Sequence, residues 1–151
     1  MITEPDMARL EERIGYHFQT PELLHRATTR LAFAQEHQYP DGCHMDALAT
    51  LGDAVIDLLV IEALVLSGRH EKGDISVTKS NMVNMSVLRN KAEELTLHEY
   101  IRWGRGEEKQ HVWTSGRVLA ECVEALAGAV YLDGGIKAAR EVLAGLEVTG
   151  V

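Results

Sequence analysis

The sequence predicts an all-α fold with two buried helices at its centre. Apolar residues recur at helical spacing along nearly the whole chain, and no stretch alternates long enough between apolar and polar residues to indicate a strand. Two segments are apolar nearly all round, which is typical of helices enclosed by other helices. The 151 residues are 46% hydrophobic and only 5% aromatic. We therefore expect one domain with an aliphatic core.

The first half of the chain predicts two short helices and one long one. Leu10 and Ile14 indicate a first helix that ends near Gly15. Thr20 followed by Pro21 is typical of an N-cap with proline at the first helical position, and opens a second helix. The remaining elements of this half are a loop over residues 37–43 and the first central helix, the longest predicted, over residues 45–66.

The second half predicts shorter helices around the second central one. The elements are, in chain order, a helix from residue 73, a helix after residue 86, a glycine-punctuated loop over 103–116, the second central helix over 118–132, a turn at 133–135 and a closing helix over 138–146. Val77 and Met85 are expected to point inward.

Charge and cysteine content restrict the possible partners. The net charge of −8 argues against a generic nucleic-acid binder, which usually carries a basic stripe. A protein that holds cations in an acidic cluster and meets phosphates through a few basic residues is the exception. No apolar run reaches the about 18 residues of a membrane span, so no membrane partner is expected. Cys43 and Cys122 are isolated, and no secretory signal precedes them, which indicates reduced thiols in the cytoplasm.

The two central helices carry carboxylates at spacings that place them on shared faces. On the first central helix, about two turns separate Asp46 from Asp53, and one turn separates Asp53 from Asp57. On the second, one turn separates Glu121 from Glu124. If the helices pack together, these side chains converge into a cluster suited to Mg²⁺ or Mn²⁺. Such a metal can activate water and stabilise a phosphodiester transition state. Spacing alone leaves open the alternative that the acids are solvated, with Asp46 favouring the helix dipole.

Local strings in the chain resemble the nuclease domain of the ribonuclease III family. Residues 51–55 are similar to the core of the family's signature helix, and residues 119–135 are similar to its second conserved string. Other segments that resemble strings of the family, and occur in the same order along the chain, are 14–18, 21–24, 73–76, 82–84 and 104–109. The resemblance covers roughly residues 8–146. It implies the ribonuclease III endonuclease-domain fold in a single domain, residues 1–151, without a double-stranded RNA-binding domain.

The resemblance also implies a set of metal ligands. The family's four acidic positions fall on Ala49, Asp53, Glu121 and Glu124. Asp53 and Glu124 are expected to be catalytic and to bind Mg²⁺, or Mn²⁺ in its place, with the assistance of Glu121. Ala49 removes one ligand. Asp46 stands at the first acidic position of the signature and is expected to support the metal through a water.

One stretch of the first central helix also resembles the compact mini-ribonuclease III branch. Residues 47–57 share its small residues before the central Asp and its acid four residues later. Asp57 is therefore a candidate for the missing ligand, with a water as the alternative. Thr50 replaces a Phe that the family uses in dimer packing.

The RNA contacts are expected to come from the nuclease domain itself. Double-stranded RNA is recognised mainly through its shape, 2′-hydroxyls and phosphates. The candidates for phosphate contact are Arg105, Lys109, His111 and Arg117. A solvated loop is the alternative for each of them, and Lys79 is expected to be an ordinary surface residue.

Together these features predict a homodimeric, Mg²⁺-dependent endoribonuclease that hydrolyses phosphodiester bonds in double-stranded RNA, as in ribosomal RNA processing. The alternative is a catalytically impaired relative that serves as an RNA-binding or ribosome-associated structural protein. Ala49 and Thr50 favour this alternative. The retained acids at Asp53, Glu121 and Glu124 oppose it.

Overall fold

The computed structural model describes residues 4–149, and its regular elements are all helices, which confirms the predicted all-α class. Its helices are α1 (Met7–Ile14), α2 (Pro21–Ala27), α3 (Leu31–Glu36), α4 (Asp46–Leu66), α5 (Lys72–Met82), α6 (Met85–Glu94), α7 (Arg105–Lys109) and α8 (Gly116–Gly145), with 3₁₀ turns η1 (Leu97–Tyr100) and η2 (Val112–Thr114). Within these residues no β-strand forms, and Thr29 and Arg102 make only an isolated bridge.

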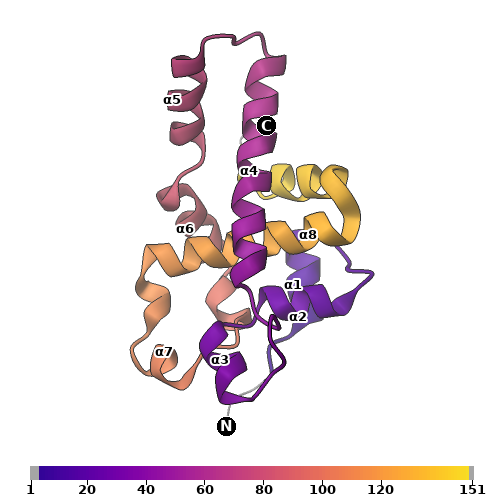
Figure 1. The fold of residues 1–151 in the computed structure, drawn as a ribbon, viewed down its shortest axis with the longest axis vertical. Helices are drawn as coiled ribbons and strands as arrows, with labels where there is room; N and C mark the ends of the chain where they lie inside the picture. Colours follow the sequence, from indigo (N-terminus) through magenta and orange to yellow (C-terminus); the bar gives the residue numbers. More distant parts are fainter. Residues whose placement is uncertain (1–3, 150–151) are drawn as a thin grey trace.

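The two predicted central helices are α4 and α8, and they cross in the middle of the molecule (Figure 1). The helices α1, α2 and α3 lie around one end of α4, and α6 packs along α8. At the other end of α4, α5 stands beside it and projects from the rest of the fold. The core is aliphatic, as expected, and its fully buried side chains include Leu10, Leu48, Ile56, Val130 and Leu143.

The crossing of α4 and α8 depends on two glycines. A Cβ on Gly52 would lie 1.7 Å from the carbonyl oxygen of Glu124, and a Cβ on Gly128 would lie 2.1 Å from the carbonyl oxygen of Leu48. Any larger residue would push the backbones apart, since these distances are far below van der Waals contact. The close approach brings Asp53, the residue after Gly52, next to α8.

The bend in α8 falls at Gly135, inside the predicted turn. Its backbone has φ 81° and ψ −176°, a conformation that favours glycine, and the residues after it fold back over α8 as the closing helix (Figure 1). The turn and the closing helix are therefore confirmed. The bend divides α8 into two helices, residues 116–134 and 136–145, and α4 with its 21 residues is longer than either, which confirms the prediction that the first central helix is the longest.

Asp133, just before this bend, fixes the N-terminal helices to α8. Its carboxylate accepts hydrogen bonds from the Tyr16 hydroxyl at 2.6 Å and from the backbone N–H groups of Gln19 at 2.9 Å and Thr20 at 2.8 Å. Burial alone would raise the pKa of Asp133, but these bonds outweigh it and lower the pKa. Burial and the Asp133 carboxylate raise the pKa of Tyr16 to about 12. Gly134 leaves room for the Tyr16 hydroxyl.

Three details depart from the sequence-based expectations. The short helix α3 was not predicted. The expected loop over residues 103–116 contains α7 and η2, and Glu107 accepts a hydrogen bond from the Gly104 N–H at the start of α7. Val77 and Met85 do not point inward; they are 62% and 54% exposed. Val77 lies on α5, which projects beyond the body and has no further layer to cover it, and Met85 is the first residue of α6. No helix within residues 4–149 is long and apolar enough to cross a membrane.

Candidate active site

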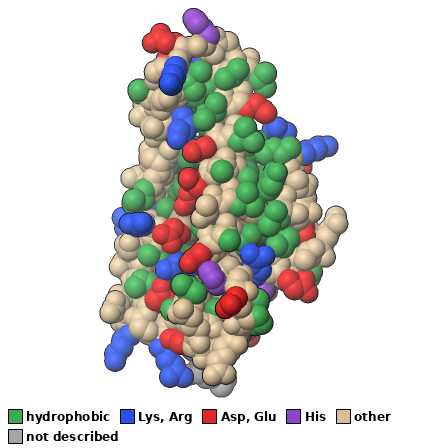
Figure 2. Space-filling model, in the orientation of Figure 1, with side chains coloured by type: hydrophobic (Ala, Val, Ile, Leu, Met, Phe, Trp, Pro, Cys, Tyr) green, Lys and Arg blue, Asp and Glu red, His purple; other side chains and the backbone are tan. Residues whose placement is uncertain are grey.

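A groove lined by carboxylates lies where α4 crosses α8. Asp53 comes from α4, and Glu121 and Glu124 come from α8. All three line two adjoining pockets. The first pocket is also lined by Asp57, Lys79, Asn84 and Arg117. The second is also lined by Asp46, Ala49 and Thr50. We call these two pockets the acidic groove. Acidic side chains gather along the middle of this face in Figure 2. The structure therefore brings together all five predicted carboxylates.

The charges of the acidic groove converge most strongly on Glu124. Its pKa is raised to about 8, first by burial, then by the hydrogen bond and charge of Asp53, and further by the charges of Glu121 and Asp57. Within residues 4–149 neither Asp53 nor Glu124 has a lysine, arginine or histidine as an ion-pair partner. The two carboxyl groups therefore either share a proton, which leaves one negative charge, or hold two negative charges that an external cation compensates.

Glu121 and Asp57, in contrast, are paired with basic side chains of the protein. Glu121 lies 3.3 Å from Nη1 of Arg30 and 3.7 Å from Nε of Arg117. Asp57 lies 3.4 Å from Nζ of Lys79 on α5. These pairs border the acidic groove and leave Asp53 and Glu124 as its uncompensated centre.

The second pocket contains the position where the family's fourth acid is missing. Ala49 lines it together with Asp46 and Thr50. Asp46 has a largely exposed side chain, 3.8 Å from Nδ1 of His44. Thr50 is exposed, and its hydroxyl donates to the Asp46 carbonyl oxygen. The methyl group of Ala49 supplies no ligand, so water is what can occupy this side of the groove.

The oxygen donors of the acidic groove suit a hard cation. No group of three or more His, Cys, Asp or Glu side chains in the described part of the chain is already arranged as a metal-binding cluster. Mg²⁺ does not need such a cage, because it keeps several waters and is commonly held by one or two carboxylates together with substrate phosphates. Asp53 and Glu124, which lack a cation and face a pocket, fit this requirement.

The four predicted phosphate contacts lie in different places. Arg117, at the start of α8, lines the acidic groove. Arg105, Lys109 and His111 are exposed on and after α7, away from the groove lining. Lys79, expected to be an ordinary surface residue, lines the groove. Asn84 also lines the groove; it was not singled out from the sequence, and its only signal was its place in residues 82–84, one of the strings that resemble the family.

Cys122 plays no nucleophilic part in the groove. The side chain is completely buried in the core, and burial raises the pKa of its thiol to about 12. A thiol needs to ionise to act as a nucleophile. Cys122 is therefore a residue of the hydrophobic core.

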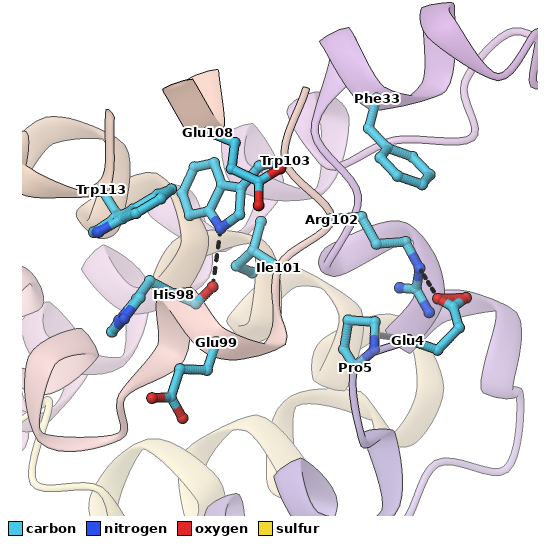
Figure 3. A pocket seen from close by; sticks show the side chains of 10 residues that line it. All are labelled: Glu4, Pro5, Phe33, His98, Glu99, Ile101, Arg102, Trp103, Glu108 and Trp113. Atoms are coloured by element: carbon cyan, nitrogen blue, oxygen red, sulfur yellow. Dashed lines mark hydrogen bonds and ion pairs between the residues drawn. The ribbon is translucent and has the colours of Figure 1, made fainter. Parts of the chain in front are cut away.

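A separate hollow beside α7 is lined by both tryptophans of the chain together with Phe33 and His98 (Figure 3). The rings of Trp103 and Trp113 lie 5.3 Å apart, and Nε1 of Trp103 donates to the carbonyl oxygen of His98 at 2.9 Å. The guanidinium of Arg102 lies 3.5 Å from the Glu4 carboxylate. The other carboxylates of the hollow are those of Glu99 and Glu108. This composition disfavours an anionic ligand and sets the hollow apart from the acidic groove.

The fold and the acidic groove define an all-α protein with a carboxylate site at a helix crossing. A model of ribonuclease-III-like proteins matches residues 20–146. The chain belongs to the ribonuclease III family.

Known relatives cover most of this fold. The chain is 39% identical over 140 residues to ribonuclease 3 of Bordetella avium, a match covering 91% of this chain and 52% of the relative. It is 36% identical over 135 residues to ribonuclease 3 of Cupriavidus pinatubonensis, covering 89% and 50%. The nuclease domain of ribonuclease III from Campylobacter jejuni superimposes with a TM-score of 0.83 at 28% identity, covering 93% of this chain and 95% of that one. The chain thus spans about half the length of the curated relatives it matches.

Proposed function

We propose that the protein is an endoribonuclease that hydrolyses phosphodiester bonds in double-stranded RNA with a divalent cation, Mg²⁺ or Mn²⁺, held by Asp53 and Glu124. The observation that carries this proposal is the Asp53–Glu124 pair at the helix crossing, which needs a compensating charge and has no basic partner within residues 4–149. Membership of a family whose relatives are named ribonuclease 3 supports the reaction type.

The residues of the acidic groove divide the work of cleavage between them. Asp53 and Glu124 hold the cation, and Glu121 assists from the rim. A bound Mg²⁺ supplies charge neutralisation at the phosphate and activation of a water. Glu124 must lose its proton before it can bind the cation, because the metal and the proton compete for the same oxygens. Arg117 lies where it can meet a neighbouring phosphate of the substrate.

Asp46 and Asp57 act from opposite sides of this centre. Asp57 is paired with Lys79, so we assign it an electrostatic contribution in the groove and keep direct ligation as the less favoured role. Asp46, beside Ala49, supports the cation through water. Lys79 joins Arg117 as a candidate phosphate contact. Arg105, Lys109 and His111 remain proposed contacts for more distant phosphates of a long duplex.

A second copy of the chain is the proposed partner of the protein. Leu58, Ile61 and Val65 are exposed along one face of α4, at 53%, 37% and 52%, and Leu132 of α8 is 51% exposed. A hydrophobic patch lies beside the acidic side chains in Figure 2. The relative from Campylobacter jejuni is described as having a region involved in dimer formation. Two grooves in a homodimer would cut the two strands of one duplex, with ribosomal RNA precursors in the cytoplasm as the expected substrates.

The direct test is cleavage of a long double-stranded RNA by the purified protein. We expect cutting with Mg²⁺ or Mn²⁺, none with chelator, and little on single-stranded RNA of the same sequence. Asp53→Asn should reduce the rate at least about 100-fold, the scale of losing a group that stabilises the transition state. Arg140→Gln, which removes an exposed ion pair with Glu62, is the matched control and should cut normally. A folded protein that binds the duplex without cutting it under any of these conditions would contradict the proposal.

A further inference from the structure

A chain of hydrogen bonds connects the start of α7 to the acidic groove. The Gly104 N–H donates to Oε1 of Glu107 at 3.1 Å. The other carboxylate oxygen of Glu107 accepts from Nε and Nη2 of Arg30 at 3.0 and 2.8 Å. Nη1 of Arg30 then donates to Oε2 of Glu121 at 3.3 Å. The planar guanidinium therefore contacts Glu107 with one edge and Glu121 with the other.

Arg30 is held in place on every side before it reaches Glu121. Its side chain is only 15% exposed, and its guanidinium lies 5.8 Å from the centre of the Trp103 ring and 3.7 Å from Sδ of Met45. Trp103 is itself fixed by its bond to the His98 carbonyl oxygen (Figure 3). A guanidinium fixed this way loses little further freedom when it binds a second carboxylate.

Glu121 has a side chain that needs such an anchor. It is 38% exposed, and the arm of a glutamate is one methylene longer than that of an aspartate. A longer arm samples more rotamers, and ordering it costs conformational entropy. Arg30 occupies Oε2 and leaves Oε1 on the side of Arg117, which borders the groove.

We propose that Arg30, backed by Glu107, is a positioning residue that fixes the Glu121 carboxylate at the rim of the cation site. The inference rests on the proposed function, since it concerns how the acidic groove holds its cation. It also gives a purpose to residues 104–109, a string that follows family order without any catalytic side chain. Hydrogen-bond partners of ligating carboxylates typically change metal affinity 10- to 100-fold when they are removed.

The direction in which cation affinity changes when Arg30 is replaced distinguishes a positioning role from a purely electrostatic one. Arg30 is a positive charge near a cation site, so its removal would strengthen cation binding if charge were its only contribution. If Arg30 positions Glu121, its removal weakens binding. Arg30→Lys keeps the charge but lacks the planar fork that contacts two carboxylates at once, so it should weaken binding as well.

The experiment is a double-mutant cycle on Mn²⁺ affinity, measured by isothermal titration calorimetry on the full chain. We expect Arg30→Gln to weaken Mn²⁺ binding about 10-fold or more, and to have no further effect in a Glu121→Gln background. Arg140→Gln, which removes an exposed arginine–glutamate pair outside the groove, is the control. The Mg²⁺ concentration needed for half-maximal RNA cleavage should rise in parallel in Arg30→Gln.

Three outcomes would overturn the inference: Mn²⁺ affinity in Arg30→Gln equal to or above that of the unchanged protein, additive losses in the double variant, or full affinity in Arg30→Lys. Thermal unfolding checks that each variant is folded. If Arg30→Gln does not fold, Glu107→Gln and Arg30→Lys take its place in the double-mutant cycle. Asp53→Asn separates the two proposals. Loss of Mn²⁺ binding and cleavage in that variant upholds the proposed function even when Arg30→Gln has no effect, whereas an unchanged protein that binds no Mn²⁺ overturns both.

Discussion

At the scale of single residues, Glu124 links the groove's geometry to a measurable property. Burial and the adjacent Asp53 raise its pKa from the ordinary value of 4.5 to about 8 in the absence of a cation. A carboxyl group with a raised pKa in the folded state stabilises the fold while it is protonated. That contribution is complete below the pKa of the unfolded chain and is lost as the pH rises through about 8.

We therefore expect the metal-free protein to lose unfolding free energy between about pH 4.5 and pH 8 because of this group. Glu124→Gln should remove that part of the pH dependence and make the metal-free protein more stable near pH 8. Urea unfolding of both proteins in chelator measures the difference in unfolding free energy. Comparing the two proteins at each pH cancels the contribution of the histidines, which both contain. Parallel curves for the two proteins across this range would contradict the assignment.

The residues of the site were predictable only where the sequence carries a local signal. The spacing of Asp53 with Asp57, and of Glu121 with Glu124, indicates shared helix faces, and the family resemblance selects among them. Arg30 has no such signal, since it is 91 positions from Glu121 and meets it only through the tertiary fold. Lys79 was missed for the same reason.

At the scale of elements, the crossing of α4 and α8 holds the carboxylates of Asp53 and Glu124 together. Gly52→Ala should destabilise the protein by about 3 kcal/mol or more, the upper part of the range for overpacking, because the added methyl group would overlap the Glu124 carbonyl. It should also weaken Mn²⁺ binding by separating Asp53 from Glu124.

Gly145→Ala is the matched control for this prediction. Gly145 is the last residue of α8, and a Cβ there would meet nothing within 4 Å. It should leave stability unchanged or raise it by a few tenths of a kcal/mol, since alanine favours the helix. Urea unfolding of both variants measures the contrast. Equal stability of Gly52→Ala and the unchanged protein would show that the helices can separate without cost.

The long helices were predictable, and so were the short helices α1 and α2, whose ends Gly15 and Thr20–Pro21 mark, whereas α3 and α7 were not. Periodicity over many residues identifies α4 and α8, whereas α3, with six residues, is too short for a periodic pattern. The start of α7 depends on Glu107 and Gly104. The error at Val77 has a different cause, because an apolar position indicates a face to cover but not whether a neighbouring element covers it.

At the scale of the whole molecule, the exposed apolar face of α4 is the proposed surface of self-association. We expect the combined variant Leu58→Asp and Val65→Asp to convert a homodimer into a folded monomer, because charges would have to be buried in the interface. Sedimentation velocity measures the change. Val77→Asp, at an equally exposed position on α5, is the control and should remain dimeric. A wild-type protein that is monomeric at micromolar concentration would contradict the proposed partner.

The organisation of the whole chain was predicted correctly in its architecture. The all-α class and the two central helices follow from apolar periodicity alone. The prediction of one domain over residues 1–151 without a double-stranded RNA-binding domain stays a prediction, and its two ends lie outside the described residues. Arg105, Lys109 and His111 likewise stay predicted RNA contacts, because α7 places them away from the groove lining.

The central claim is that Asp53 and Glu124 support cleavage although Ala49 supplies no fourth carboxylate. The most direct measurement is the Mg²⁺ dependence of double-stranded RNA cleavage by the unchanged protein and by Ala49→Glu, whose new carboxylate would enter the second pocket. We predict that both cut, and that Ala49→Glu reaches half-maximal rate at a lower Mg²⁺ concentration. Cutting by Ala49→Glu alone, with none by the unchanged protein at any concentration of Mg²⁺ or Mn²⁺, would contradict the claim and identify an impaired relative.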